Sequence, residues 1–222
     1  MKINLFRPVS GLFGAGARLG LVVALGATGL WADGATLKEA RTALETLSAR
    51  NRTAPSVSLV FSSRVMGADG DWTLPTQGSL VTADSGRFRL KHAQGVIISD
   101  GKTMWQHFPS TKQVVIRPVA ARGHGGAGGV LLRFLQARAV AATRGPDGGL
   151  RIVLDPASVG ENLDSLVLTL SSDAARVRKV ETQDPAGNRA EYTVSSVRYD
   201  GRPGRNTFTF KVPEGADVVD MR

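Results

Sequence analysis

The side chains best suited to acid–base chemistry in this 222-residue sequence are three histidines, His92, His107 and His124. An imidazole can act as a general acid, a general base or a metal ligand near neutral pH. None of the three is spaced from another histidine or a carboxylate so that two ligands would share one element. We therefore expect no metal site, and a structural role for each histidine.

Two further segments hold residue types that enzymes use. Ser99 and Asp100 could belong to a hydrolase, but the sequence has no Gly-x-Ser-x-Gly elbow, and Asp100-Gly101 is typical of a turn between strands. The glycine-rich stretch 123–129 lacks the Lys-Ser/Thr ending of a phosphate-binding loop. The absence of cysteine excludes catalytic thiols, thiolate metal sites and disulfides. None of these segments therefore singles out a catalytic residue.

Residues 1–32 have the organisation of a secretory signal peptide. Basic residues precede an apolar run over 19–30, and small residues follow before Asp33. The run is shorter than the ~20 residues that a membrane-spanning helix needs. We expect export to the periplasm of a Gram-negative bacterium with cleavage after Gly29 or Ala32, and an uncleaved anchor is the alternative. Residues 33–222 would then form a single domain.

The formal net charge of +9 includes the basic residues of this leader, so the exported chain keeps a smaller basic excess. Such an excess suits a protein that works beside anionic lipid or an acidic partner. In the alternating segment 87–91, Phe88 points away from the basic side chains, so no aromatic platform for bases is formed. Nucleic acid is not an expected partner.

Hydrophobic periodicity predicts a mainly β chain with two helices. Leu37, Leu44 and Leu47 lie on one stripe of a helix of about three turns that begins near Thr36, and a second helix is expected over 130–142. Short runs separated by turn residues predict about eleven strands. They cover residues 56–62, 77–83, 87–92, 96–98, 103–108, 113–117, 150–154, 163–171, 177–183, 189–199 and 206–212.

Several of these strands are apolar at consecutive positions, as in 96–98, 114–116 and 166–168. Such runs indicate that both faces of an antiparallel sheet are covered, one of them by helices. A curved sheet wrapped around the helices satisfies this pattern, and a two-sheet sandwich is the alternative.

Two motif blocks carry a resemblance to a known family. The segment Ile98–Trp105 (ISDGKTMW) and the segment Phe208–Val219 (FTFKVPEGADVV), together with Gly78-Ser79-Leu80 ahead of Phe88, resemble the LolA-like family of periplasmic outer-membrane lipoprotein carriers. The resemblance implies an incomplete antiparallel barrel of about eleven strands, with a helical lid over an apolar concave face. One departure is Asp84-Ser85, where the family commonly has Arg-Pro, so lid closure would need other contacts here.

The resemblance also implies a function. Members receive lipoproteins that an ATP-driven transporter releases from the inner membrane and hand them to an outer-membrane receptor; they are not enzymes and need no cofactor. We therefore expect a monomeric chaperone that binds lipoprotein acyl chains non-covalently. Expected partners are the lipoproteins, the inner-membrane lipoprotein-releasing ABC transporter and, if the resemblance extends that far, an outer-membrane receptor. The alternatives are a lipid-binding or envelope-sensing module for another amphiphile, such as a glycolipid, and then an enzyme of unknown type.

The residues expected to bind acyl chains come from both the sheet and the helices. Phe88 takes this role from its family position, and the other residues take it from periodicity. Ordinary core packing is the alternative for each. Glycines 125–129 would act as a hinge for the second helix. The expected lining is Phe88, Leu90 and Trp105 from the concave sheet, and Leu37, Leu44, Val130, Leu131 and Phe134 from the helices.

Overall fold

A computed structural model describes residues 34–67, 70–119, 134–199 and 201–222. The predicted signal segment 1–32 and the predicted glycine hinge lie outside these ranges. Among the described residues, no helix has the length and apolar character needed to cross a membrane.

The described part of the chain contains one α-helix and twelve β-strands. The helix α1 spans Gly34–Thr53. Three short 3₁₀ turns are η1 (Pro109–Thr111), η2 (Phe134–Gln136) and η3 (Pro156–Val159). The strands are β1 (Ser56–Met66), β2 (Thr76–Ala83), β3 (Arg87–His92), β4 (Gly95–Asp100), β5 (Thr103–Phe108), β6 (Gln113–Pro118), β7 (Arg138–Arg144), β8 (Leu150–Asp155), β9 (Ser165–Leu170), β10 (Val177–Gln183), β11 (Arg189–Arg198) and β12 (Asp217–Asp220).

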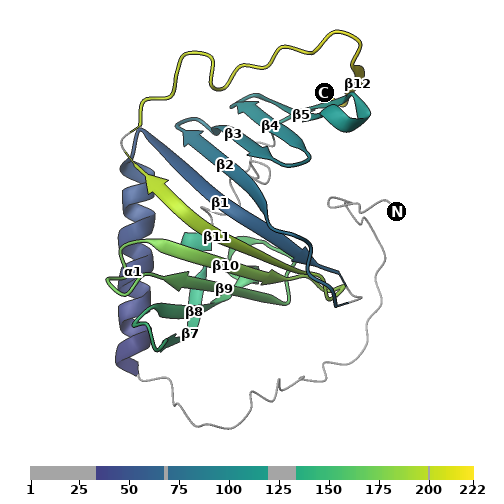
Figure 1. Ribbon diagram of the computed structural model, residues 1–222. Helices are drawn as coiled ribbons and strands as arrows, with labels where there is room; N and C mark the ends of the chain where they lie inside the picture. The colour runs from purple at the N-terminus through teal and green to yellow at the C-terminus, as the bar shows by residue number, and fades with distance from the viewer. Residues whose placement is uncertain (1–33, 68–69, 120–133, 200) are drawn as a thin grey trace. The chain divides into compact units, whose positions relative to one another are not determined.

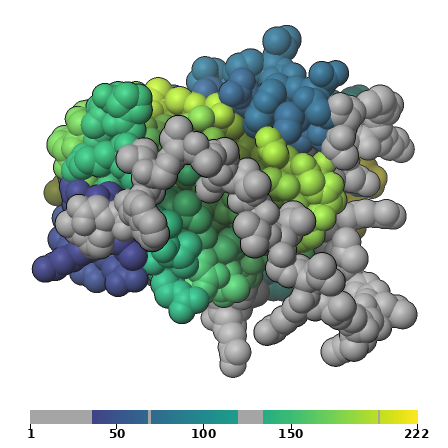
Figure 2. Space-filling view, turned by 90° about the horizontal axis from the view of Figure 1, so that it is seen from below, coloured from purple at the N-terminus to yellow at the C-terminus, as the bar shows by residue number. Residues whose placement is uncertain are grey.

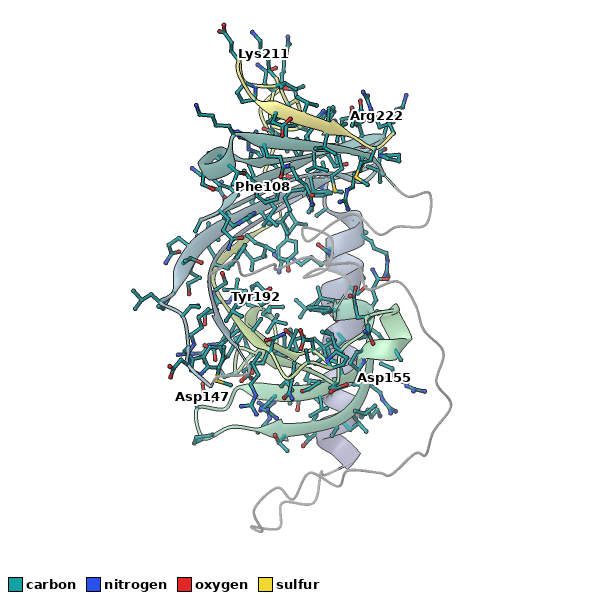
Figure 3. The ribbon with its side chains drawn as sticks, turned by 90° about the vertical axis from the view of Figure 1, so that its right-hand side faces the viewer. Phe108, Asp147, Asp155, Tyr192, Lys211 and Arg222 are labelled. Carbon is teal, nitrogen blue, oxygen red and sulfur yellow. The ribbon has the colours of Figure 1, made fainter. Side chains whose placement is uncertain are left out.

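All twelve described strands belong to one sheet with the order β12-β6-β5-β4-β3-β2-β1-β11-β10-β9-β8-β7. Neighbours pair antiparallel, except that β12 runs parallel to β6. The sheet is curved and does not close, and α1 crosses its strands (Figures 1 and 3). The predicted open antiparallel sheet with a helix is confirmed, and the sandwich alternative is excluded because the strands form one sheet.

We call the face of the sheet that α1 covers the inner face. Alternation places Val57, Leu59 and Phe61 of β1 on it, and all three are buried. The predicted stripe of α1 is confirmed, since Leu44 and Leu47 are buried in the cluster that the helix forms with η2 and strands β7–β10. The helix is longer than expected, because its 20 residues begin before Thr36 and place that residue inside the helix.

The outer face of β3–β6 is covered by the C-terminal segment 201–216, which leads into β12 (Figure 1). The ring of Phe210 lies 6.2 Å from the ring of Trp105 and 5.8 Å from that of His107. Phe208 is buried, and the Arg87 guanidinium lies over its ring at 5.4 Å. This cover explains why β4 and β6 are apolar at consecutive positions, as the sequence predicted.

The predicted second helix over 130–142 is wrong for residues 134–142, which are the part of it that the structure describes. Residues 134–136 form η2 and residues 138–144 form strand β7, while 130–133 lie outside the described residues. Pairing with β8 overrides the helix preference of this alanine-rich stretch. Ala139 and Ala142 are buried on the inner face, where their small side chains let α1 approach β7 closely. Figure 2 shows the purple residues of α1 beside the green residues that follow position 133.

The predicted strand over 206–212 is also wrong. Residues 205–208 form turns, and the following chain is irregular until β12. A phenylalanine at every second position suggested a strand, but Phe208 and Phe210 act as separate anchors on the outer face.

Candidate functional site

The inner face carries two apolar clusters. The α1 cluster lies beneath the helix and is formed by strands β7–β10 with η2 and α1. The β2–β4 cluster lies further along the sheet, away from the strands that α1 contacts most. Its buried members are Leu59, Phe61, Leu80, Phe88, Leu90 and Ile97, and Met104, Tyr192, Val194 and Val197 pack against it.

Strand register makes the β2–β4 cluster continuous. Leu59 lies opposite Leu80, Leu80 opposite Leu90, and Leu90 opposite Ile97, so four leucine and isoleucine side chains cross four strands in one row. Cross-strand partners on one face have Cβ atoms about 5 Å apart, which is contact distance for such side chains. The row therefore forms an uninterrupted apolar strip across the sheet.

Gly78 lets Phe61 enter this cluster. The two residues are cross-strand partners, and a Cβ atom on Gly78 would come within 2.4 Å of the Phe61 ring. No heavy-atom side chain fits there without moving the ring. The Gly78-Ser79-Leu80 motif thus has a packing reason.

Tyr192 joins the two clusters. Its ring meets the Phe61 ring edge-on at 6.0 Å and 66°, and it packs against both sets of residues (Figure 3). Burial raises the pKa of Tyr192, so its phenol stays neutral and able to donate a hydrogen bond at neutral pH. It is a polar group on an otherwise apolar stretch of the inner face.

A polar cleft of about 160 Å³ lies where α1 ends and β1 begins. Val57 and Thr82 line it, and Thr82 lies opposite Phe88 in the register of β2 and β3. The apolar inner face therefore reaches a polar opening. The lining residues are Asn51, Arg52, Ala54, Ser56, Val57, Thr82, Ala83 and Asp84.

Comparison with known proteins identifies the family. Residues 52–211 match the family described as "Outer membrane lipoprotein carrier protein LolA". The chain belongs to this family. Outer-membrane lipoprotein carrier proteins of Chromohalobacter salexigens and Vibrio cholerae are similar to it. The first is 27% identical over 182 residues, covering 79% of this chain and 85% of that protein. The second is 26% identical over 181 residues, covering 80% and 90%.

A solved structure supports the fold. The crystal structure of an uncharacterized conserved protein from Thermus thermophilus aligns with a TM-score of 0.50 and 14% identity. The alignment covers 82% of this chain and 98% of that one.

The residues expected to line a carrier site fall into both clusters. Phe88 and Leu90 are 3% and 6% exposed in the β2–β4 cluster. Leu44 and Phe134 are buried in the α1 cluster, and Leu37 packs against its edge. Val130 and Leu131 lie outside the described residues. The structure thus brings together Phe88 with Leu90, and Leu44 with Phe134, as two separate groups.

The expected place of Trp105 on the concave face beside Phe88 is wrong. Trp105 lies opposite Ile98, and Ile98 lies opposite Arg89, so these three side chains share the outer face. Met104 holds the inner position instead. Because β5 carries Met104 and Trp105 at consecutive positions, the sequence does not show which of these two apolar residues points inward.

The sequence analysis missed eight residues of the β2–β4 cluster: Leu59, Phe61, Leu80, Ile97, Met104, Tyr192, Val194 and Val197. The alternation of Val57, Leu59 and Phe61 was visible in the sequence, but nothing linked it to Leu80 before the register was known. Tyr192 had no signal, because β11 alternates weakly between polar and apolar residues.

At the position of the family's Arg-Pro pair, Asp84 and Ser85 form the turn between β2 and β3. Ser85 and Gly86 have φ of +58° and +73°, and the Asp84 carboxylate pairs with Arg87. The neighbouring turn at Asp100 is also structural, since its Oδ1 accepts from the backbone N–H groups of Lys102 and Thr103 at 2.8 and 2.7 Å. Asp84 therefore has a partner within its own hairpin.

The histidines have structural surroundings where they are described. Burial lowers the pKa of His92, and its Nδ1 accepts from the Gln94 backbone N–H at 3.3 Å. His107 contacts Phe210 on the outer face, and His124 lies outside the described residues. Within the described ranges, no group of three or more His, Asp or Glu side chains could hold a metal ion.

Proposed function

We propose that this chain binds the acyl chains of lipoproteins non-covalently on the inner face of its sheet. The observation that carries the proposal is the uninterrupted row from Leu59 to Ile97 on a sheet that stays open. Membership of the lipoprotein carrier family supports it.

The free energy of exposing an acyl chain to water requires a carrier to have an apolar binding surface. Each CH₂ group of an acyl chain that leaves water contributes ~0.8 kcal/mol, so one long chain costs on the order of 10 kcal/mol to expose. A carrier that crosses an aqueous compartment must cover most of this surface. Phe88, Leu90 and Met104 place apolar side chains, which suit an apolar acyl chain, in one region of the inner face.

Membership of the family supports a proposal for the wider role. We place the protein in the periplasm of a Gram-negative bacterium, exported by residues 1–32 and acting as a monomer without a cofactor or catalysis. It would accept lipoproteins from an inner-membrane ABC transporter and deliver them toward the outer membrane, with a receptor there as the further partner.

A second candidate is a carrier for another amphiphile, such as a glycolipid. It is favoured by the turn at Asp84, where a carboxylate paired with Arg87 replaces the basic residue common in the family. Mass spectrometry of lipid bound to the purified protein separates the two candidates, because only lipoprotein cargo yields acylated peptides.

The test is co-purification from cells with labelled lipoproteins. Wild type and the outer-face variant Val60→Glu should recover labelled lipoprotein, because Val60 is 44% exposed and tolerates a charge. Phe88→Glu should recover little, since it places a carboxylate within the apolar β2–β4 cluster that contains this row. Circular dichroism establishes that the variants are folded, and the milder Phe88→Ala serves if Phe88→Glu is not. Negligible recovery by wild type, or equal recovery by a folded Phe88 variant, would refute the proposal.

A further inference from the structure

Arg117 stands out as a half-buried cation without a partner among the described residues. Its Nε atom is buried and has no hydrogen-bond acceptor, and none of its nitrogens makes a hydrogen bond or an ion pair within the described ranges. Two other half-buried cations are paired with a carboxylate: Lys179 Nζ lies 2.8 Å from Glu191 Oε2, and Arg64 bonds the same group, while Arg89 donates to the Thr207 carbonyl. Arg117 therefore differs from comparable basic residues of the sheet.

Strand register places Arg117 on the inner face. Phe88 lies opposite Ser99, Ser99 opposite Met104, and Met104 opposite Arg117. These four residues form one row across β3–β6. With strands about 4.8 Å apart, the row runs roughly 15 Å from the apolar cluster to the guanidinium.

The nearest strand neighbours of Arg117 on the inner face are uncharged, with Met104 opposite it and Gln106 opposite Val115. Met104 beside it packs against the β2–β4 cluster. Val115, two residues earlier on β6, lies opposite Val219 of β12. The Val219 side chain is 39% exposed. A largely apolar and otherwise uncharged surface, interrupted by Ser99 and Gln106, thus continues to the edge of the described sheet beside the Arg117 cation.

An unpaired cation beside apolar surface is costly unless an anion approaches it. The segment 120–133 that follows β6 contains no Asp or Glu that could supply the counter-charge. The charge is therefore available to a ligand.

We propose that Arg117 binds the anionic head group of an amphiphile, a carboxylate or a phosphate, whose hydrocarbon chain lies over Met104 toward Phe88. The planar guanidinium matches both groups, since either presents two oxygens to its fork of N–H donors. This inference rests on the proposed function, because it uses the same inner face for the chain. It adds that the preferred cargo carries a negative charge next to its acyl chain.

The experiment compares two probes of equal chain length, decanoate and decan-1-ol. Each displaces the neutral fluorescent probe N-phenyl-1-naphthylamine from the purified protein. The variant Arg117→Met removes the charge and keeps an unbranched apolar side chain. Arg151→Met is the matched control, because Arg151 is an exposed arginine of β8 on the outer face.

The measured quantity is the ratio of the decan-1-ol to the decanoate inhibition constant. It should fall by roughly tenfold or more in Arg117→Met relative to wild type and Arg151→Met, since hydrogen bonds to charged groups have about this strength. Decan-1-ol affinity should stay within about twofold. Arg117→Lys should keep part of the preference, because it retains the charge without the fork.

Three outcomes distinguish failure of the proposed acyl-binding function from failure of the head-group inference. If neither probe displaces the dye from wild type, the proposed acyl-binding function itself fails. If both displace it and the ratio is unchanged in Arg117→Met, the head-group inference alone is overturned. Inorganic phosphate should not displace the dye; if it competes as well as decanoate, the ligand is a free anion and the amphiphile assignment is wrong.

Discussion

At the scale of single residues, Gly78 shows how one missing side chain shapes the inner face. The Phe61 ring occupies the space where a Cβ atom at position 78 would lie. We expect Gly78→Val to lower the free energy of unfolding by about 1–3 kcal/mol, as overpacking does, although valine favours strands. Urea denaturation measures the loss.

The control for this prediction is Ser79→Val, one residue along on the opposite face of β2. It should change the stability little, because surface changes usually lie within about 0.5 kcal/mol. Combining Gly78→Val with Phe61→Leu should restore part of the loss by freeing space. Additive losses in the double variant would contradict the packing explanation.

The ion pairs of Glu191 predict a pH dependence. Burial would raise the pKa of Glu191, but hydrogen bonds from Arg64 and Lys179 outweigh it and hold the pKa below its ordinary 4.5. The folded state therefore gains stability from this carboxylate above its ordinary pKa, and the gain is lost as pH falls through the lowered value.

We expect Arg64→Met to cost no more than about 1 kcal/mol at pH 7, because the Arg64 side chain is 39% exposed and solvent screens its ion pair. The difference from wild type should shrink as the pH falls below 4.5, the ordinary pKa of Glu191. Thermal unfolding at several pH values measures both. The control is Arg189→Met, which changes an exposed arginine of the same sheet; its stability difference from wild type should not shrink at low pH. If Arg64→Met loses the same stability at every pH, the role of Arg64 lies in its stacking on Trp72 instead.

At the scale of elements, the C-terminal segment fastens the outer face of β3–β6. Phe210→Ala removes the ring that contacts Trp105 and His107. We expect amide hydrogen exchange to quicken in β5, β6 and β12, while β8 and β9 stay protected, because local opening follows the loss of local contacts. Val212→Ala, a change at a more exposed neighbour, is the control. Faster exchange throughout the sheet would mean that the segment supports the whole fold.

The sequence predicted elements well where turn chemistry marked both ends. Strands β3, β5 and β10 begin and end at the predicted residues, because tight turns flank them. Strand β7 was missed because its alanines favour a helix locally, and only pairing with β8 makes them a strand. Strand β12 was missed because four exposed residues pair in parallel with a strand a hundred positions earlier.

The site was less predictable than the fold, because it depends on which face each strand presents. Phe88 and Leu90 were found since alternation in β3 is clear, whereas Trp105 was assigned to the wrong face because β4 and β5 carry apolar residues on both. In the sequence, nothing distinguishes Arg117 from the other basic residues of the strands. Its lack of a partner among the described residues depends on which side chains the strand register brings beside it, such as Met104, and no local pattern encodes that register.

At the scale of the whole molecule, the two clusters divide stability from binding. Leu44 and Leu90 are equally buried, at 4% and 6% exposure, but Leu44 lies between α1 and the sheet while Leu90 lies on the proposed acyl-binding row. If the α1 cluster is a core, Leu44→Ala should cost about 2–5 kcal/mol of unfolding free energy, as buried leucines generally do. Its affinity for decan-1-ol should stay near that of wild type.

Leu90→Ala should instead weaken decan-1-ol binding by roughly fivefold or more, because the truncated side chain removes apolar contact area from the bound chain. Bound ligand should also raise the melting temperature of wild type and Leu44→Ala alike, since stabilisation by ligand depends on its concentration relative to the dissociation constant. The same ligand concentration should stabilise Leu90→Ala less. Denaturant titration and dye displacement on the two variants measure both quantities. A weaker affinity in Leu44→Ala than in Leu90→Ala would move the acyl-binding surface beneath the helix, and α1 would then have to leave the sheet for cargo to enter.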